Sequence, residues 1–361
     1  QLQYTRPALN ISNGVIAVTG NSAFDGAPLG LPVTVPVPLV SGSDALQRED
    51  PLYDLDVHGL DALDVATILV IVENHGRGKD GAYDVRLRES LPLGLSPTDV
   101  VAGSLSASRG DGAAVALPAG AETALFSAAG LFLPGPVLER AVMADGTAND
   151  TGSNILYLTY QVRLPEDTES RQSLTIVSAV TEYAAQAGGN NLTGPGLITD
   201  GVTISVVAPA VLKRVVATSE AHSPETGTAR PVAVGEVVRY RLEITVPEGQ
   251  TSDLVITDAL PNGLAYQAST GVRLAAVSQA AGALSLHATD GTPWLTPPAA
   301  AAPPAGVLDA ANSAEVPAAR VGLAGTTLTL SLGDVRNAAD DAAVERLVLE
   351  FNVLVRNVAA N

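Results

Sequence analysis

Oxygen-bearing side chains gather in one loop, residues 145–154, where their chemistry suits a calcium ion. The loop reads Asp-Gly-Thr-Ala-Asn-Asp-Thr-Gly-Ser-Asn and offers Asp145, Asn149 and Asp150 as ligands. Calcium takes about six to eight oxygen ligands, which closely spaced Asp and Asn side chains supply. The spacing matches no EF-hand, and the bidentate Glu that ends such a loop is missing. Two interpretations stay open, a structural calcium site and a polar turn between strands.

The groups that usually carry covalent or acid–base catalysis are absent or scattered. The chain has no cysteine, which excludes disulfides, thiolate metal sites and cysteine nucleophiles. Its four histidines fall in separate predicted loops and strands without metal-ligand spacing. No Gly-x-Ser-x-Gly motif occurs. We therefore predict that the protein is not an enzyme.

Composition limits the classes of partner. The 361 residues include 38 acidic and 20 basic side chains, for a net charge of −18. Such a charge disfavours binding to nucleic acid or to an anionic membrane surface. The apolar runs are also far shorter than the roughly 20 residues that a membrane-spanning helix needs. The sequence predicts neither nucleic-acid binding nor membrane insertion, and its length suggests two domains at about 150 residues each.

An internal repeat divides the chain. Residues 83–95 match 252–264, residues 156–162 match 347–353, and the Pro-Ala pair at position 7 recurs at position 209. The same landmarks recur in the same order, which is typical of homologous domains in tandem. We predict one unit over 1–208, with a long insertion at about 27–60, and a second over 209–361.

Alternating hydrophobicity predicts that both units are built of β-strands. Val238, Tyr240, Leu242 and Ile244 alternate with polar residues, as expected for a strand with one buried face. The strand 65–72 departs from this pattern because it is apolar on both faces, so it needs a cover on each side. The cover could be the insertion at 27–60 or another subunit, and the first is favoured because loops commonly cover their own domain.

The second unit is predicted to lack its closing strands. Unit one continues past its 156–162 strand into apolar runs at 174–180 and 202–206, whereas the chain ends at Asn361 soon after the matching strand. A sandwich without these strands has an open edge and an incompletely covered core. Either the parent protein is longer, or a neighbouring chain donates the strand.

Three segments carry a resemblance to a known family. Residues 235–245, 254–266 and 332–335 resemble the conserved-repeat domain of large bacterial cell-surface proteins, which is related to the isopeptide-forming D2 domains of surface pilins and adhesins. The resemblance is good over most of 209–361 and weaker over 1–208. It implies an all-β fold of tandem Ig-like antiparallel β-sandwiches, located outside the cell on a bacterial surface.

The resemblance also implies a crosslink site in the second unit. Some relatives join a lysine to an asparagine with help from a buried carboxylate, and Lys213 stands at the family's lysine position. Asp258 or Glu243 could be the acid, and the acceptor Asn is expected on the missing last strand. The alternative is a surface lysine beside Arg214.

The first unit departs from the family pattern. Asn13 stands at the lysine position, and Ser178 lies near the expected Asn. The first unit is therefore predicted not to crosslink.

Together these features favour a structural role. We expect a self-assembling surface layer, filament or adhesin stalk whose partner is a second copy of itself, with strand donation between chains as one route to assembly. The alternative is a glycan- or protein-binding adhesion module that uses long loops at 27–60 and 284–318 as its recognition surface.

Overall fold

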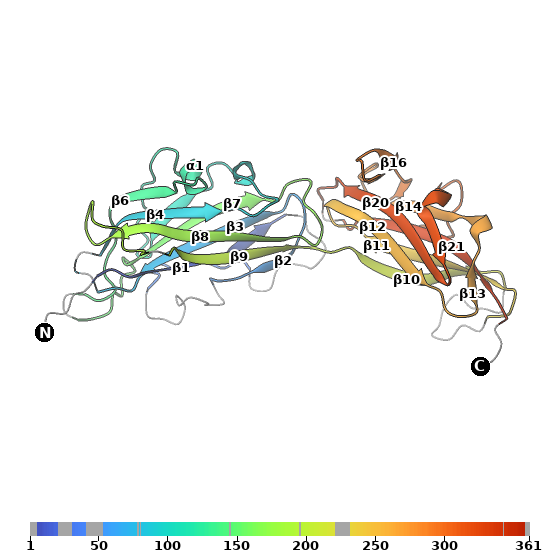
Figure 1. The fold of residues 1–361 in the computed structure, drawn as a ribbon, viewed down its shortest axis with the longest axis horizontal. Coiled ribbons are helices and arrows are strands. Elements are labelled where there is room, and N and C mark those ends of the chain that lie inside the picture. Colours follow the sequence, from blue (N-terminus) through green and yellow to red (C-terminus); the bar gives the residue numbers. More distant parts are fainter. Residues whose placement is uncertain are drawn as a thin grey trace. The chain divides into compact units, whose positions relative to one another are not determined.

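The computed structural model describes residues 6–20, 31–40, 53–77, 79, 81–143, 146–194, 196–220, 232–341 and 343–357. They form two compact units. Unit 1 comprises the described residues up to Pro165 and those from Gln172 to Val206, and unit 2 comprises Glu166–Arg171 and the described residues from Val207 onward. Each unit consists of two packed β-sheets, which confirms the prediction of an all-β fold with tandem antiparallel β-sandwiches (Figure 1).

The two sheets of unit 1 enclose one hydrophobic core. In hydrogen-bonding order, the first contains β1 (Leu9–Thr19), β3 (Val65–Asn74), β7 (Ile155–Arg163) and β5 (Ser106–Arg109). The second contains β2 (Val57–Leu60), β9 (Ile198–Val206), β8 (Ser173–Ala184), β4 (Ala82–Ser90) and β6 (Leu131–Leu138). The short helices η2 (Pro97–Asp99) and α1 (Ala121–Leu125) lie in connections.

Unit 2 has a similar pair of sheets around its own core. The first contains β10 (Ala210–Thr218), β11 (Val237–Thr245), β21 (Arg346–Val355), β14 (Val272–Val277) and β17 (Ala299–Ala300), with β13 (Leu264–Tyr266) and β18 (Ala314–Glu315) at its margins. The second contains β12 (Gly249–Ala259), β20 (Thr327–Asn337), β15 (Leu284–His287), β16 (Pro293–Leu295) and β19 (Val321–Ala324). The helices η3 (Ala268–Thr270) and η4 (Ala318–Arg320) connect strands.

Local irregularities fix which strands of the two units correspond. The pairing of β1 with β3 shifts register between Val15 and Ala17, and the pairing of β10 with β11 shifts between Val215 and Ala217. A β-bulge adds a residue to one strand and kinks it, so a bulge at the matching place marks the matching strand. β10 is thus the counterpart of β1, with Lys213 in the position of Asn13.

A second pair of irregularities aligns β12 with β4. Asp84 in β4 and Asp253 in β12 both adopt a left-handed backbone, with φ of 53° and 48°. Few residues other than glycine adopt this conformation, although Asp and Asn tolerate it best. The alignment places Asp258 of β12 in the position of Glu89 of β4.

The units differ in what pairs with these strands. β4 is hydrogen-bonded to β6 on one side and to β8 on the other, and β8 in turn pairs with β9. Within the described residues, β12 has β20 as its only strand neighbour. Its other edge is bridged only at Gln250, by Glu169 of the same unit. The positions that β8 and β9 fill in unit 1 therefore have no described counterpart in unit 2.

The outer face of β3 is covered from within the chain. Leu39 and Tyr53, from the insertion at 27–60, are 2% and 3% exposed and pack with Leu69 and Ile71 of β3. The expectation that the insertion covers the strand apolar on both faces is therefore confirmed for the described residues. The cover explains how a strand without alternation lies in a two-sheet fold.

Candidate functional site

A buried polar network joins both sheets of unit 1. The Asn13 amide donates to the Ser178 hydroxyl over 2.8 Å, and Ser178 donates to the Glu89 carboxylate over 2.9 Å. Tyr160 donates to the same carboxylate oxygen over 3.0 Å. All four side chains are at most 3% exposed. The network thus ties β1 and β7 of one sheet to β4 and β8 of the other.

Burial controls the protonation of this network. It raises the pKa of Glu89 from the ordinary 4.5 to about 7, while the hydrogen bonds from Ser178 and Tyr160 oppose the rise. Burial, followed by the nearby charge of Glu89, raises the pKa of Tyr160 well above its usual value. The network contains no amine that could act as a nucleophile, and the hydroxyls of Ser178 and Tyr160 both donate to Glu89. Its arrangement therefore serves to hold the strands together.

The equivalent position in unit 2 holds an ion pair. Both carboxylate oxygens of Asp258 lie 2.7 Å from the Lys213 Nζ. The same Nζ lies 4.1 Å from the centre of the Tyr240 ring, which adds a cation–π contact. The Lys213 and Asp258 side chains are 31% and 10% exposed. The structure thus brings together the lysine and one of the two carboxylates that the sequence singled out.

Glu243, the other carboxylate, lies elsewhere. It accepts a hydrogen bond from Arg214 over 2.5 Å. Side chains alternate along a strand, and Glu243 follows the buried Leu242, so it points to the face of the sheet away from Lys213. Of the two candidates, Asp258 is the acid beside Lys213, and the assignment of Glu243 is corrected.

The loop proposed for calcium is only partly described. Asp145 lies outside the described residues, and Asp150 is exposed. The Asn149 side chain is buried, and its oxygen accepts hydrogen bonds from the backbone and the hydroxyl of Thr151, which occupy both lone pairs. Asn149 thus organises the turn. No group of three or more His, Asp or Glu residues in the described part of the chain could hold a metal ion, and calcium binding stays a prediction.

A buried arginine cluster lies on the outer face of the first sheet of unit 2. Arg241, 2% exposed, donates its Nε to the Glu350 carboxylate over 2.7 Å, and Arg239 pairs with the same carboxylate. The guanidinium of Arg241 also donates to the carbonyls of Pro304 and Gly306. These hydrogen bonds hold the Ala/Pro-rich loop at 299–313 against the outer face of the sheet.

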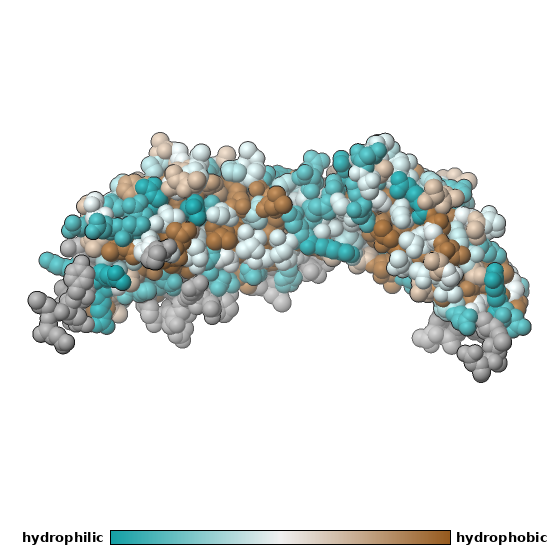
Figure 2. All heavy atoms as spheres, in the orientation of Figure 1, coloured by the Kyte–Doolittle hydropathy of each residue, from teal (hydrophilic) through white to brown (hydrophobic). Residues whose placement is uncertain are grey.

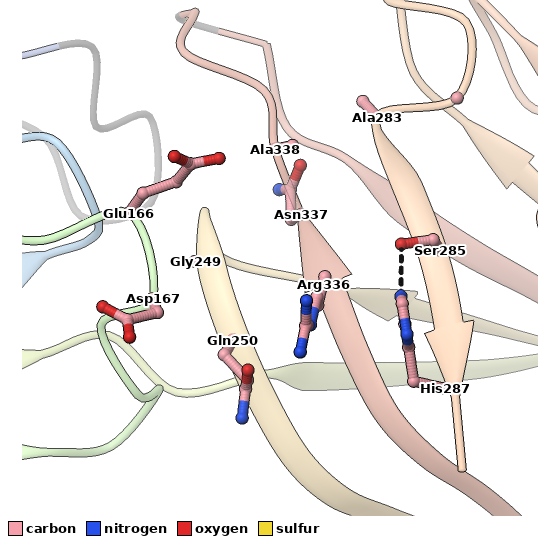
Figure 3. Close-up of a pocket in the computed structure, with 11 residues that line it drawn as sticks. Glu166, Asp167, Gly249, Gln250, Ala283, Ser285, His287, Arg336, Asn337 and Ala338 are labelled. Atoms are coloured by element: carbon pink, nitrogen blue, oxygen red, sulfur yellow. Dashed lines mark hydrogen bonds between the residues drawn. The ribbon is translucent and has the colours of Figure 1, made fainter. Parts of the chain in front are cut away.

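A cavity of about 650 Å³ opens in unit 2. It lies between the Glu166–Arg171 segment and the ends of β12, β15 and β20, and Glu166, Asp167 and Arg336 are among its lining residues (Figure 3). Its polar lining of both charges suits a ligand with several hydroxyls or a mixed-charge segment.

His287 lies at the edge of this cavity with both ring nitrogens in hydrogen bonds. Its Nδ1 lies 2.9 Å from the Gly291 carbonyl, and its Nε2 lies 3.0 Å from the Ser285 hydroxyl. A carbonyl oxygen only accepts, so Nδ1 carries a hydrogen and donates to Gly291, while Nε2 is hydrogen-bonded to the Ser285 hydroxyl (Figure 3). Both ring nitrogens of His287 therefore bind groups of unit 2 itself.

Sequence reasoning missed several of these groups. Glu89 lies opposite Asp258 in the repeat match of 83–95 with 252–264, so that match was the signal that could have found it. The alternating pattern does not indicate which side chains Tyr160, Arg241 and Glu350 contact.

No protein-family model and no curated protein matches the chain. Among solved structures it is similar to the C-terminal domain of the antigen I/II-family protein AspA of Streptococcus pyogenes, at 14% identity and a TM-score of 0.29, covering 98% of this chain and 92% of that one. It is also similar to the T6 backbone pilin of Streptococcus pyogenes, at 9% identity and a TM-score of 0.27, covering 77% of this chain and 55% of the pilin. The RrgB pilus protein of Streptococcus pneumoniae gives 12% identity and a TM-score of 0.28, over 97% of this chain and 37% of RrgB.

The three neighbours are a domain of an antigen I/II-family protein and two pilus proteins. Identities and TM-scores this low assign neither a family nor a function. Among the described residues, no helix has the length and apolar character to cross a membrane.

Proposed function

We propose that this chain is a structural protein of the bacterial cell surface, where tandem β-sandwiches build a layer, a filament or an adhesin stalk. One observation carries the proposal: the two units repeat a single strand framework, including the bulges and the paired polar groups between the sheets. Tandem repetition of one domain is typical of extended arrays. The polar groups between the sheets bind one another, which suits a mechanical role better than a catalytic one.

Negative-stain electron microscopy of the purified chain, with and without a calcium chelator, tests this role. Ordered filaments or sheets are the expected result, since the proposed partner is a second copy. Their loss on chelation would support calcium binding to the 145–154 loop. Single particles at every concentration would contradict self-assembly.

We further propose that Lys213 forms an isopeptide bond once an Asn side chain is brought against it. The Lys213 ammonium first gives a proton to the Asp258 carboxylate, and the neutral Nζ then attacks the amide carbonyl carbon of the Asn, so that a new C–N bond forms, the amide C–N bond breaks and ammonia leaves. The Asp258 carboxyl polarises the carbonyl and transfers the protons. Its contact with Nζ at 2.7 Å supports the assignment.

A chimera tests the crosslink. Residues 164–207 of unit 1, carrying Ser178→Asn, are joined after Val355, so that the transplanted strand places an amide opposite Asp258. The expected intact mass is lower by one ammonia, and the same chimera with Asp258→Ala keeps its full mass. A chimera that shows a cooperative thermal transition of unit 2 yet retains the ammonia would contradict the crosslink.

The cavity favours a second candidate function, a binding module for glycans or protein segments. Arg336 and Gln250 line it and would bind hydroxyl or carboxylate groups. Arg336→Ala is expected to abolish any signal on a glycan array, while Arg356→Ala, an exposed residue outside the cavity, is expected to leave the signal intact. An array without any bound glycan would contradict glycan binding.

A further inference from the structure

Three charged side chains that line the cavity of unit 2 have no partner within the described part of the chain. Arg336 of β20 is exposed, and its guanidinium makes no hydrogen bond or ion pair there. Glu166 and Asp167 are exposed as well, and neither carboxylate has a partner among the same residues. Hydrophobic and hydrophilic residues mix over the surface of unit 2 (Figure 2), so polarity alone does not distinguish the cavity. Unpaired charges of both signs around one hollow do distinguish it.

The lack of a partner for Arg336 is notable because acidic side chains outnumber basic ones in this chain, 38 to 20. Elsewhere in unit 2, Arg214 pairs with a glutamate, and both Arg239 and Arg241 pair with another. Glu166 and Asp167 line the same cavity as Arg336, yet the structure forms no ion pair between them. The cavity is therefore a space in which one ligand can reach all three charges.

Other polar side chains of the lining already bind groups of the protein. Both ring nitrogens of His287 are in hydrogen bonds. The Asn337 amide donates to one backbone carbonyl over 2.9 Å and accepts from a backbone N–H over 3.1 Å. The Gln250 amide nitrogen donates to Glu169 over 2.9 Å. Recognition of charged groups on a ligand therefore falls to Arg336 and the two acids.

Backbone hydrogen bonds fix the acidic wall of the cavity to the start of β12. The Gln250 N–H donates to the Thr168 carbonyl over 2.9 Å, and the Ser170 N–H donates to the Gln250 carbonyl over 2.8 Å. Glu166 and Asp167 directly precede this anchored stretch, and Arg336 comes from the neighbouring strand β20 (Figure 3). Groups that are held in place before binding lose less conformational entropy when a ligand arrives.

We propose that this cavity binds a short peptide that carries a free C-terminal carboxylate together with two ammonium groups. The carboxylate pairs with the Arg336 guanidinium, whose planar fork matches a carboxylate with two parallel hydrogen bonds. The ammonium groups pair with Glu166 and Asp167. The volume of about 650 Å³ is typical of small-molecule sites, which range over roughly 300–1,000 Å³. The proposal rests on the binding function proposed for this cavity and names its class of ligand.

The charges of the lining favour this class of ligand over a neutral glycan. One guanidinium and two carboxylates are neutralised by one carboxylate and two ammonium groups. A neutral glycan would displace water from all three charges without pairing them, which costs free energy. A simple anion would pair with Arg336 and leave both acids without a partner.

Titration of the full chain with the dipeptide lysyl-alanine, followed by NMR, tests the proposal. The dipeptide carries two ammonium groups and one carboxylate at about pH 6, below the pKa of its α-amino group. Its C-terminal amide lacks the carboxylate and is the matched ligand. Lysyl-alanine is expected to give saturable shifts, and the amide is expected to bind the wild-type chain at least about tenfold more weakly.

Arg336→Ala separates a carboxylate contact from a structural effect. It is expected to raise the Kd of lysyl-alanine at least about tenfold and to change the Kd of the amide by less than about twofold. The double variant Glu166→Gln with Asp167→Asn is expected to weaken both ligands at least about tenfold, because both carry the ammonium groups. Arg356→Ala, at an exposed site outside the cavity, is the control expected to stay within about twofold of wild type.

Two results would overturn the proposal. One is equal weakening of lysyl-alanine and its amide by Arg336→Ala, which would show that the variant disturbs the cavity as a whole. The other is the absence of lysyl-alanine binding. If a neutral glycan then binds and depends on Arg336, the binding function of the cavity stands and only this class of ligand falls. If neither ligand binds, both proposals for the cavity fall.

Discussion

A titratable carboxyl at Glu89 makes the interior of unit 1 depend on pH. Burial holds its pKa at about 7, against 4.5 in the unfolded chain. The folded state thus keeps a proton that the unfolded state releases over this interval. Stability from Glu89 is fully present below pH 4.5 and is lost as the pH rises through about 7.

Glu89→Gln is expected to remove this dependence. The difference in unfolding free energy between wild type and variant should fall by roughly 3 kcal/mol between pH 4.5 and 7. Urea unfolding of both proteins across this range measures it. The Gln oxygen still accepts from Ser178 and Tyr160, so folding is retained. Parallel curves would contradict the raised pKa.

Two Arg–Glu pairs in unit 2 are expected to differ in their contribution to stability. Glu350 is fully buried against Arg241, so Glu350→Ala leaves a buried charge unpaired and should cost about 3–5 kcal/mol. Glu243 pairs with Arg214, whose side chain is 48% exposed, and Glu243→Ala should cost less than about 1 kcal/mol.

Urea denaturation of unit 2 distinguishes these outcomes. Equal losses for the two variants would show that the 299–313 loop does not bury the Glu350 pair in solution. Limited proteolysis would check this result, since a loop detached from the sheet should become the first site of cleavage.

At the scale of elements, each first sheet has its outer face covered by an irregular segment of its own unit. In unit 1 the cover packs Leu39 and Tyr53 on β3, and in unit 2 Leu308 packs against Val348 of β21. An Ig-like sheet normally exposes that face to water. The covers therefore allow apolar strands in a sheet that would otherwise expose them.

Leu39→Ala is expected to destabilise unit 1 by about 2–3 kcal/mol, because it removes apolar contacts and opens a cavity under the cover. Exposure of the outer face of β3 should also increase association with concentration. Thermal unfolding and size-exclusion chromatography measure the two effects. Leu93→Ala, at a site 96% exposed, is the control expected to change neither.

The strands and the matching of the units could be predicted from the sequence, because alternation and repeat spacing are local. The family resemblance singled out Asn13 and Ser178, which the structure joins by a hydrogen bond. Which side chains meet across the two sheets depends on packing, so the partnership of Glu89 with Tyr160 could not be read from the pattern. Glu243 illustrates the limit, since the sequence could not choose between it and Asp258, whereas in the structure Asp258 contacts Lys213 and Glu243 pairs with Arg214.

At the scale of the whole molecule, the net charge of −18 opposes association between copies. Salt screens this repulsion, with a Debye length of about 10 Å at 0.1 M. Association between copies must therefore overcome a long-range electrostatic repulsion, which weakens as ionic strength rises.

Self-association is therefore expected to increase with the concentration of sodium chloride. Light scattering at low and at moderate salt measures this increase. Calcium chloride at matched ionic strength separates screening from binding. A larger effect of calcium would support a calcium ion bound by the 145–154 loop, and an equal effect would contradict a specific calcium site. Association that decreases with salt would contradict the repulsion argument.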